Sequence, residues 1–125
     1  MPDNPLARHG KIAYIEIPAL DATVSAAFYE AVFGFHIHPG TPDRVAFEDA
    51  TSELIGGFTR QRAVVLEPGV MPWIYVTSVA ETLERICAEG REVVMQPTPE
   101  GDTLLASFRD PAGNLTGVWQ FIRTD

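Results

Sequence analysis

The sequence has only one cysteine, few basic residues and no long apolar run. A single cysteine, Cys87, excludes an internal disulfide, and its place in an apolar helical pattern indicates a small core residue. No apolar run approaches the roughly 20 residues that a membrane-spanning helix needs, so no membrane partner is expected. The segment Met1 to Lys11 lacks the apolar stretch of a secretory signal, which favours a cytoplasmic location.

Basic residues are scarce relative to acidic ones. Nine Lys and Arg residues oppose 17 Asp and Glu residues, which gives a net charge of -8. Phosphate recognition needs clustered Lys and Arg, so nucleic acid is not an expected partner. The chain also lacks a Gly-rich phosphate loop, an HExxH segment, a Cys-His nucleophile pair and a Ser-centred elbow. Nucleotide-dependent and hydrolase chemistry therefore have no support.

What remains is an ordinary globular composition with two similar halves. The 125 residues are 46% hydrophobic, which is sufficient for one α+β domain with a packed core. The predicted half-repeats cover about residues 11–60 and 70–123. Apolar periodicity, capping residues and turn residues predict the order β-α-β-β-β in each. The first contains strands over residues 12–18, 35–39, 44–48 and 53–59, and a helix from Asp21 or Thr23 to Phe33 that ends at Gly34. The second contains strands over 73–77, 92–96, 103–109 and 115–122, and a helix over 79–89 that ends at Gly90.

Two segments of the halves can be aligned without gaps, FEDATSELIGGF from Phe47 and FRDPAGNLTGVW from Phe108. Identity or aromatic character is kept at spaced positions, which indicates an internal duplication. The matched pairs are Phe47 and Phe108, Asp49 and Asp110, Leu54 and Leu115, Gly56 and Gly117, and Phe58 and Trp119.

Two segments carry a resemblance to a known family. IEIPALDATVSAAFYEAVFGF, from Ile15 to Phe35, is similar to the first strand and helix of the vicinal oxygen chelate superfamily, and ASFRDPAGNLTGVWQ, from Ala106 to Gln120, is similar to its last hairpin. That superfamily includes glyoxalase I, bleomycin-resistance proteins and extradiol dioxygenases. The resemblance implies two βαβββ modules with curled mixed sheets around a cleft, and a homodimer.

The resemblance also implies metal ligands on the first and last strand of each half. The equivalent positions fall at or next to Tyr14, at or next to Gly56, near Met71 to Trp73, and at Gly117. These residues do not supply the imidazole, carboxylate or thiolate donors of a divalent metal site. The prediction is therefore that the chain uses no metal or other cofactor.

Glu16 and a histidine pair are the candidates for chemistry. Glu16 lies two residues after Tyr14, so both side chains share a strand face, and Glu16 is either a general base in the cleft or simply exposed if the register differs by one residue. His36 and His38 have the same two-residue spacing and form an alternative metal pair, with Glu16 or Glu48 as the third donor. A solvated strand end is the simpler interpretation of the two histidines.

Aromatic and sulfur side chains gather near the family's cleft positions and predict an apolar ligand pocket. The basic residues Arg60, Arg62 and Arg109 are candidates to attract an anionic ligand, although a solvated surface is the simpler role for Arg60 and Arg62. The predicted pocket residues are Tyr14, Phe58, Met71, Trp73, Tyr75, Trp119 and Arg109.

These features favour a metal-independent protein that binds a small organic molecule, similar to drug-sequestering bleomycin-resistance proteins. The alternative is a lyase or dioxygenase of the glyoxalase type that uses an unusual site around Glu16, His36 and His38. A third hypothesis is a structural or partner-binding subunit without a ligand.

Overall fold

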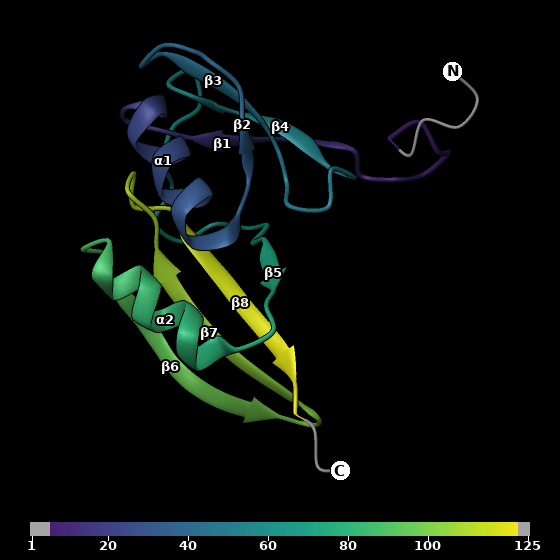
Figure 1. Ribbon diagram of the computed structural model, residues 1–125, viewed down its shortest axis with the longest axis vertical. Helices are drawn as coiled ribbons and strands as arrows, with labels where there is room; N and C mark the ends of the chain where they lie inside the picture. Colours follow the sequence, from purple (N-terminus) through teal and green to yellow (C-terminus); the bar gives the residue numbers. More distant parts are fainter. Residues whose placement is uncertain (1–5, 123–125) are drawn as a thin grey trace. The chain divides into compact units, whose positions relative to one another are not determined.

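The computed structural model describes residues 6–122 and consists of two compact units, Met1–Val64 and Val65–Asp125. Each unit contains one helix and one sheet of four strands, in the order β-α-β-β-β along the chain (Figure 1). The α+β class and the two predicted βαβββ modules are confirmed. Residues 1–5 and 123–125, which the predicted domain and its second half-repeat include, lie outside the described residues. No helix within the described part of the chain is long and apolar enough to span a membrane.

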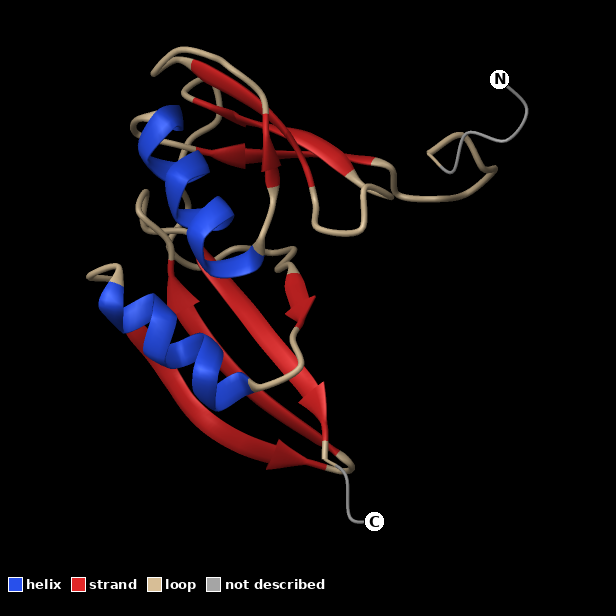
Figure 2. Ribbon diagram, in the orientation of Figure 1, coloured by secondary structure: helices blue, strands red, loops and turns tan. Residues whose placement is uncertain are grey.

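The first unit has a mixed sheet in the order β1-β4-β3-β2, in which β1 and β4 are parallel and the other pairs are antiparallel. The helix α1 packs against β2, β3 and β4 (Figure 2). The bounds are β1 Tyr14–Pro18, α1 Ala22–Phe33, β2 His36–Ile37, β3 Arg44–Glu48 and β4 Ile55–Thr59.

The second unit repeats this topology with the sheet order β5-β8-β7-β6, and its helix α2 packs against β6, β7 and β8. The parallel pair is again formed by the first and last strands of the unit, β5 and β8. The bounds are β5 Trp73–Tyr75, α2 Val79–Ala88, β6 Val93–Glu100, β7 Thr103–Arg109 and β8 Leu115–Phe121.

Local capping chemistry explains why α1 has the predicted bounds. Asp21 is the N-cap, and its carboxylate accepts hydrogen bonds from the Thr23 amide at 3.0 Å and the Thr23 hydroxyl at 2.6 Å. The hydrogen bond from the Thr23 hydroxyl is the main reason why the pKa of Asp21 is lower than its ordinary value. Gly34 ends the helix with φ +74°, a left-handed conformation that glycine adopts without steric cost.

An aromatic cluster forms the core of the first unit between α1 and the sheet. The ring of Phe58 lies 4.6 Å from Phe47 and 5.2 Å from Tyr29, measured between centroids, and Phe35 stacks on Phe47 at 5.2 Å. Tyr29, Phe47 and Phe58 are fully buried, and Phe28 and Val32 of the helix are also buried. Burial of such rings stabilises a fold by several kcal/mol in total, at about 25 cal/mol per Å² of apolar surface.

The core of the second unit is smaller and mostly aliphatic. Ile86 and Val79 of α2 are fully buried, as are Phe108 and Val118 of the sheet. Cys87 is exposed, which contradicts the prediction of a core residue. The reason is the helical rotation of about 100° per residue, which turns Cys87 away from the sheet that Ile86 faces.

The lengths of the strands differ from the prediction mainly in the strands at the edges of the two sheets. The strand β2 has only two residues, because the segment after Ile37 runs into Pro39 and Gly40. The strand β6 continues to Glu100, through Pro97 and Pro99. An edge strand tolerates proline, and the register of β6 shifts twice between Val93 and Thr98.

The two equivalent turns differ in length by one residue, although both are built on an aspartate. The Asp110 amide donates to the carbonyl of Asn114, four residues on, whereas the Asp49 amide donates to the carbonyl of Leu54, five residues on. In each turn the aspartate carboxylate accepts backbone N–H groups, which is the chemistry of an Asx turn. The turn after Asp49 therefore contains one additional residue.

Because of this additional residue, the gapless alignment of the two halves is wrong beyond the turn. Phe47 pairs with Gly56 where the matching Phe108 pairs with Thr116, and the next pairs are Ala46 with Gly57 and Ser107 with Gly117, so Gly57 and not Gly56 is the structural equivalent of Gly117. Phe58 correspondingly occupies the position of Val118 rather than that of Trp119. A shift of one residue moves a side chain to the other face of a strand, so the gapless match assigns residues to the wrong face.

Replacing Asp110 with Ala is expected to lower the free energy of unfolding by about 3 kcal/mol, because it leaves several backbone N–H groups without an acceptor at a buried turn. Asp49→Ala is the matched control in the exposed turn and is expected to cost about 1 kcal/mol. Urea unfolding followed by circular dichroism measures both. Equal losses in the two variants would contradict this account of the turns.

Candidate functional site

Each sheet has one face covered by the helix of its own unit and one face opposite that helix, which we call the open face. In β3, Val45 and Phe47 are buried toward α1, while Arg44 and Ala46 are exposed on the other side. Residues paired in register point to the same side of a sheet, so the open face of the first unit can be assigned strand by strand. It carries Tyr14 and Glu16 of β1, Gly57 of β4, Arg44, Ala46 and Glu48 of β3, and His36 of β2, with His38 following.

The centre of the first open face is a group of charged residues around Glu16. The Nε of Arg62 donates to one carboxylate oxygen of Glu16 at 2.7 Å, and Nη1 of Arg44 lies 3.8 Å from the other. The Nη2 of Arg44 donates to the Tyr14 hydroxyl. Two guanidinium groups therefore converge on one carboxylate beside a phenol.

Gly57 provides the space in which the Arg44 guanidinium lies. A Cβ atom at this position would be 2.9 Å from the central carbon and both terminal nitrogens of the guanidinium. Arg44 can therefore cross the sheet from β3 toward β1 only because the intervening β4 residue has no side chain.

Gly56 has a different role. A Cβ atom there would contact the carbonyl oxygen of Ile15 and would lie 2.6 Å from the Phe47 ring, on the side of the core. The absence of a side chain at Gly56 is thus required by packing on the side of the core.

The histidine pair lies on the first open face beside a glutamate. His36 is the register partner of Glu48, and Nε2 of His38 lies 3.1 Å from a carboxylate oxygen of Glu48. Both histidines are exposed, and the His38 side chain is 53% accessible. The structure thus places His38 against Glu48, one of the two predicted third donors, with His36 opposite Glu48 in register, while Glu16 is held by the arginines.

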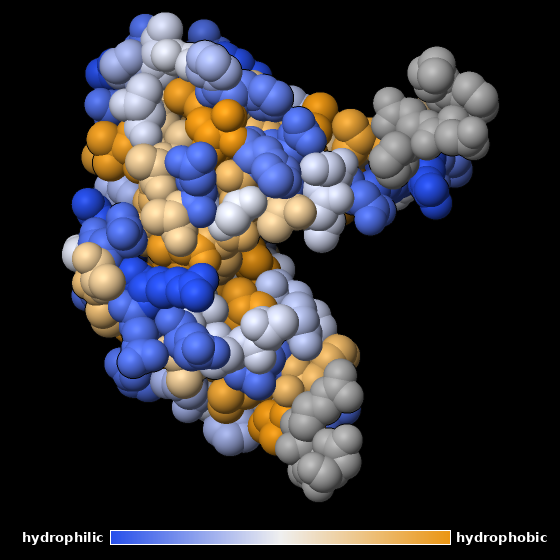
Figure 3. Space-filling model, viewed as in Figure 1, coloured by the Kyte–Doolittle hydropathy of each residue, from blue (hydrophilic) through white to orange (hydrophobic). Residues whose placement is uncertain are grey.

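The open face of the second unit is aromatic instead of charged. Trp73 and Tyr75 of β5 pair with Gly117 and Trp119 of β8, and Phe121 continues the same side of β8. Tyr75 and Trp119 meet edge to face with centroids 4.9 Å apart, and Trp119 and Phe121 do so at 5.0 Å. Trp73, Tyr75 and Phe121 are exposed, and Figure 3 shows hydrophobic surface near the end of β8. An exposed cluster of this kind is typical of a binding surface.

Gly117 is covered in the same way as Gly57. A Cβ atom at Gly117 would contact the six-membered ring of Trp73, so the missing side chain allows the indole to lie flat on the strand. In both units a large side chain covers the glycine of the last strand, an arginine in one and a tryptophan in the other.

Three predicted pocket residues lie elsewhere. Phe58 is fully buried in the core beneath α1, because the extra turn residue places it on the covered face. Met71 precedes β5 in the connecting segment and is half-buried. Arg109 donates through Nη1 to the carbonyls of Leu66 at 2.7 Å and Gly113 at 3.3 Å, so its guanidinium holds the adjacent loops together.

The donor set does not fit the metal centre that the family implies. The positions that the resemblance implies hold Tyr14, Gly56 with Gly57 beside it, Met71 to Trp73, and Gly117, which provide no imidazole, carboxylate or thiolate. Glu16, on the same face as Tyr14, has its carboxylate beside two arginines. Within residues 6–122 there is no group of three or more His, Cys, Asp or Glu side chains arranged to hold a metal ion.

Sequence reasoning missed Arg44 and Phe121 as members of the two open faces. The two-residue alternation of Arg44, Ala46 and Glu48 against Val45 and Phe47 indicates the exposed side of β3. Phe121 follows Gly117 and Trp119 at the same spacing. No local pattern, however, predicts that Arg44 crosses Gly57 to reach Tyr14.

Two βαβββ modules, each with one four-stranded sheet, define a class of proteins that includes the glyoxalases. Comparison with known protein families gives the same class. The family model described as Glyoxalase/Bleomycin resistance protein/Dioxygenase superfamily matches residues 11–118. The chain belongs to this superfamily, as the resemblance predicted. No curated protein sequence matches the chain.

Solved structures of other proteins have a similar fold. A glyoxalase/bleomycin resistance protein/dioxygenase family enzyme from Burkholderia phytofirmans PsJN has a TM-score of 0.74 at 19% identity, covering 90% of this chain and 99% of that one. A glyoxalase-related enzyme from Fulvimarina pelagi has a TM-score of 0.70 at 22% identity, with 89% and 88% covered. Lactoylglutathione lyase from Agrobacterium tumefaciens has a TM-score of 0.63 at 24% identity, with 91% and 96% covered. At these identities the likeness shows the fold alone.

Substitution of the adjacent glycines tests the assignment of the two faces. Gly56→Ala is expected to lower the free energy of unfolding by about 2 kcal/mol or more, because its methyl group meets backbone and the Phe47 ring. Gly57→Ala meets only the end of a flexible arginine and is expected to stay within about 1 kcal/mol of the parent. Urea unfolding measures both variants. Similar costs at the two positions would contradict the assignment.

Proposed function

We propose that this chain is a metal-independent binding protein for a small organic molecule, with the aromatic open face of the second unit as the main contact surface. The observation that carries the proposal is the aromatic group of Trp73, Tyr75, Trp119 and Phe121, in which Trp119 is half-buried and the other three are exposed. Aromatic rings stack on planar or apolar ligands and lose little conformational entropy when they do so. A cytoplasmic location and a homodimer belong to the same proposal.

The position of Glu16 weakens the alternative of a lyase or dioxygenase. A general base needs a carboxylate that is free to take a proton from a substrate. Arg62 donates to one carboxylate oxygen of Glu16 and the Arg44 guanidinium lies 3.8 Å from the other, so both oxygens have a positively charged neighbour. Glu16 is better suited to positioning the two arginines than to removing a proton.

A neutral aromatic probe tests the binding surface. We expect 2-naphthamide to shift the indole N–H signals of Trp73 and Trp119 in nuclear magnetic resonance spectra, and Tyr75→Ser to weaken its binding about five- to tenfold, because an aromatic contact contributes about 1 kcal/mol. Val24→Ser on α1 is the matched control, since Val24 and Tyr75 are both 47% exposed. Unchanged indole signals, or equal effects of the two variants, would speak against this surface.

Metal content separates the proposal from the enzyme alternative. Elemental analysis of untagged protein, prepared without chelator, is expected to find far less than one metal ion per chain, because the equivalent positions lack a donor set. Stoichiometric metal that disappears in the double variant His36→Ala and His38→Ala would favour the site at His36, His38 and Glu48 instead. The Arg60→Gln variant is the control, because it leaves His36, His38 and Glu48 intact.

A further inference from the structure

We propose that the first open face binds the carboxylate group of an organic anion, through Arg44, Arg62 and the Tyr14 hydroxyl. This inference rests on the proposed function, because it names the chemical class of a small-molecule ligand. All three side chains lie in the first unit, and they come from β3, from the segment after β4 and from β1.

The local charge favours an anion. Two guanidinium groups meet the single carboxylate of Glu16, so the group has one uncompensated positive charge in a protein whose net charge is -8. The side chains of Arg44 and Arg62 are 48% and 65% accessible, so a ligand can reach both. One uncompensated charge matches a monoanionic carboxylate better than a dianionic phosphate.

Hydrogen-bond donors remain available for such a ligand. Arg62 uses its Nε for Glu16, which leaves the two terminal amino groups of a planar fork that suits a carboxylate. The Tyr14 hydroxyl accepts from Arg44, so its own hydrogen is directed elsewhere and can be donated to an anion. Charge-assisted hydrogen bonds from these groups are the strong kind.

The arginines are held in place before any ligand arrives. Gly57 leaves room for the Arg44 guanidinium to lie against the sheet, and Glu16 anchors Arg62 at 2.7 Å. A side chain that is already oriented loses less rotational entropy on binding, which raises affinity. Glu16 therefore acts as a positioning residue and, at the same time, as a resident competitor for the ligand.

The fold itself does not require these charges. The second unit has the same strand pairing, yet it holds Trp73 where the first holds Glu16, and Leu105 where the first holds Arg44. A duplicated sheet thus forms with apolar residues at both positions. The charged group is specific to the first unit, which is the expected pattern for a recognition site and not for a structural requirement.

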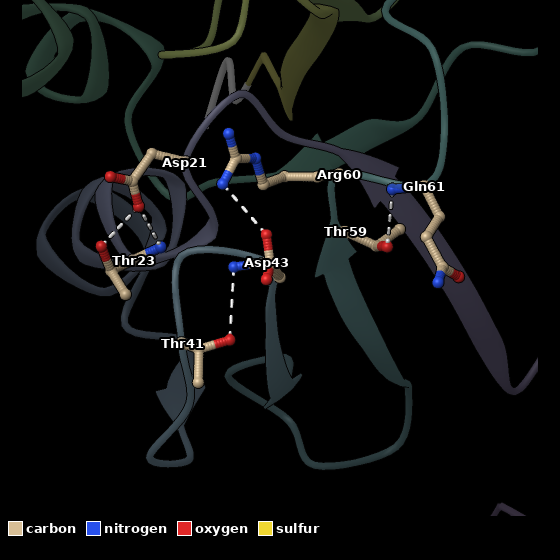
Figure 4. Close-up of polar contacts among 7 residues, drawn as sticks. All are labelled: Asp21, Thr23, Thr41, Asp43, Thr59, Arg60 and Gln61. Atoms are coloured by element: carbon tan, nitrogen blue, oxygen red, sulfur yellow. Dashed lines mark hydrogen bonds and ion pairs between the residues drawn. The ribbon is translucent and has the colours of Figure 1, made fainter.

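Arg60 provides an internal comparison. Its Nη1 donates to Asp43 at 3.0 Å, and Figure 4 shows its side chain directed toward Asp43 near Asp21 and Thr23 at the start of α1. Its charge is therefore balanced by a carboxylate outside the group around Glu16. Arg60→Gln changes the net charge of the protein as Arg62→Gln does, but it leaves the proposed site intact.

Benzoate and its neutral analogue benzamide test the proposal in the intact chain. We expect benzoate, but not benzamide, to shift the Nε–H signals of Arg44 and Arg62 in nuclear magnetic resonance titrations. Arg62→Gln should weaken benzoate binding about tenfold, the effect of one charge-assisted hydrogen bond, while Arg60→Gln leaves it unchanged. Glu16→Gln should strengthen benzoate binding severalfold, because the glutamine carbonyl can still accept from Arg62 while the competing negative charge is gone.

Three results would overturn the proposal: equal arginine shifts with benzoate and benzamide, equal weakening by Arg62→Gln and Arg60→Gln, or tighter binding of phenyl phosphate than of benzoate. The last would assign the site to phosphate esters. Failure of the proposed function is distinguishable, because it concerns the indole signals of Trp73 and Trp119 with a neutral probe. Indole shifts without arginine shifts would refute only the carboxylate site.

Discussion

Cross-strand register is the constraint on which the rest of this structure depends. Each sheet has one face against a helix, so a side chain is either in a core or on an open face according to its pairing. The turns that begin at Asp49 and Asp110 fix that pairing, since each aspartate accepts backbone N–H groups and thereby sets the loop length. One additional residue in the first turn places Phe58 in the core, whereas Trp119 reaches an open face.

The same scaffold presents two kinds of chemistry. In each unit the first and last strands are parallel neighbours, and a glycine on the last strand is covered by a large side chain from a neighbouring strand. Arg44 covers Gly57 in the first unit and Trp73 covers Gly117 in the second. The consequence is a charged open face in one unit and an aromatic open face in the other, at equivalent strand positions.

Much of the site could be predicted because strand alternation is a local property. The two-residue spacing of Tyr14 and Glu16 correctly places both side chains on one face, and the same holds for Trp73 and Tyr75. The pairing of His38 with Glu48 follows from neighbouring strands. The Arg44 contact with Tyr14 was not predictable, because it spans three strands and depends on a missing side chain at Gly57.

The sequence by itself determined the order of the elements, the bounds of α1 between Asp21 and Gly34, the duplication and the superfamily. The elements and the duplication depend on capping, periodicity and turn residues, which act over a few positions. The superfamily depends on the resemblance of two segments to the family, which the family model confirms. Only the tertiary structure decided that Gly57, and not Gly56, is the equivalent of Gly117, and which side chains meet around Glu16. The physical reason is that strand pairing joins residues distant in sequence, and a shift of one residue reverses the face of every side chain that follows.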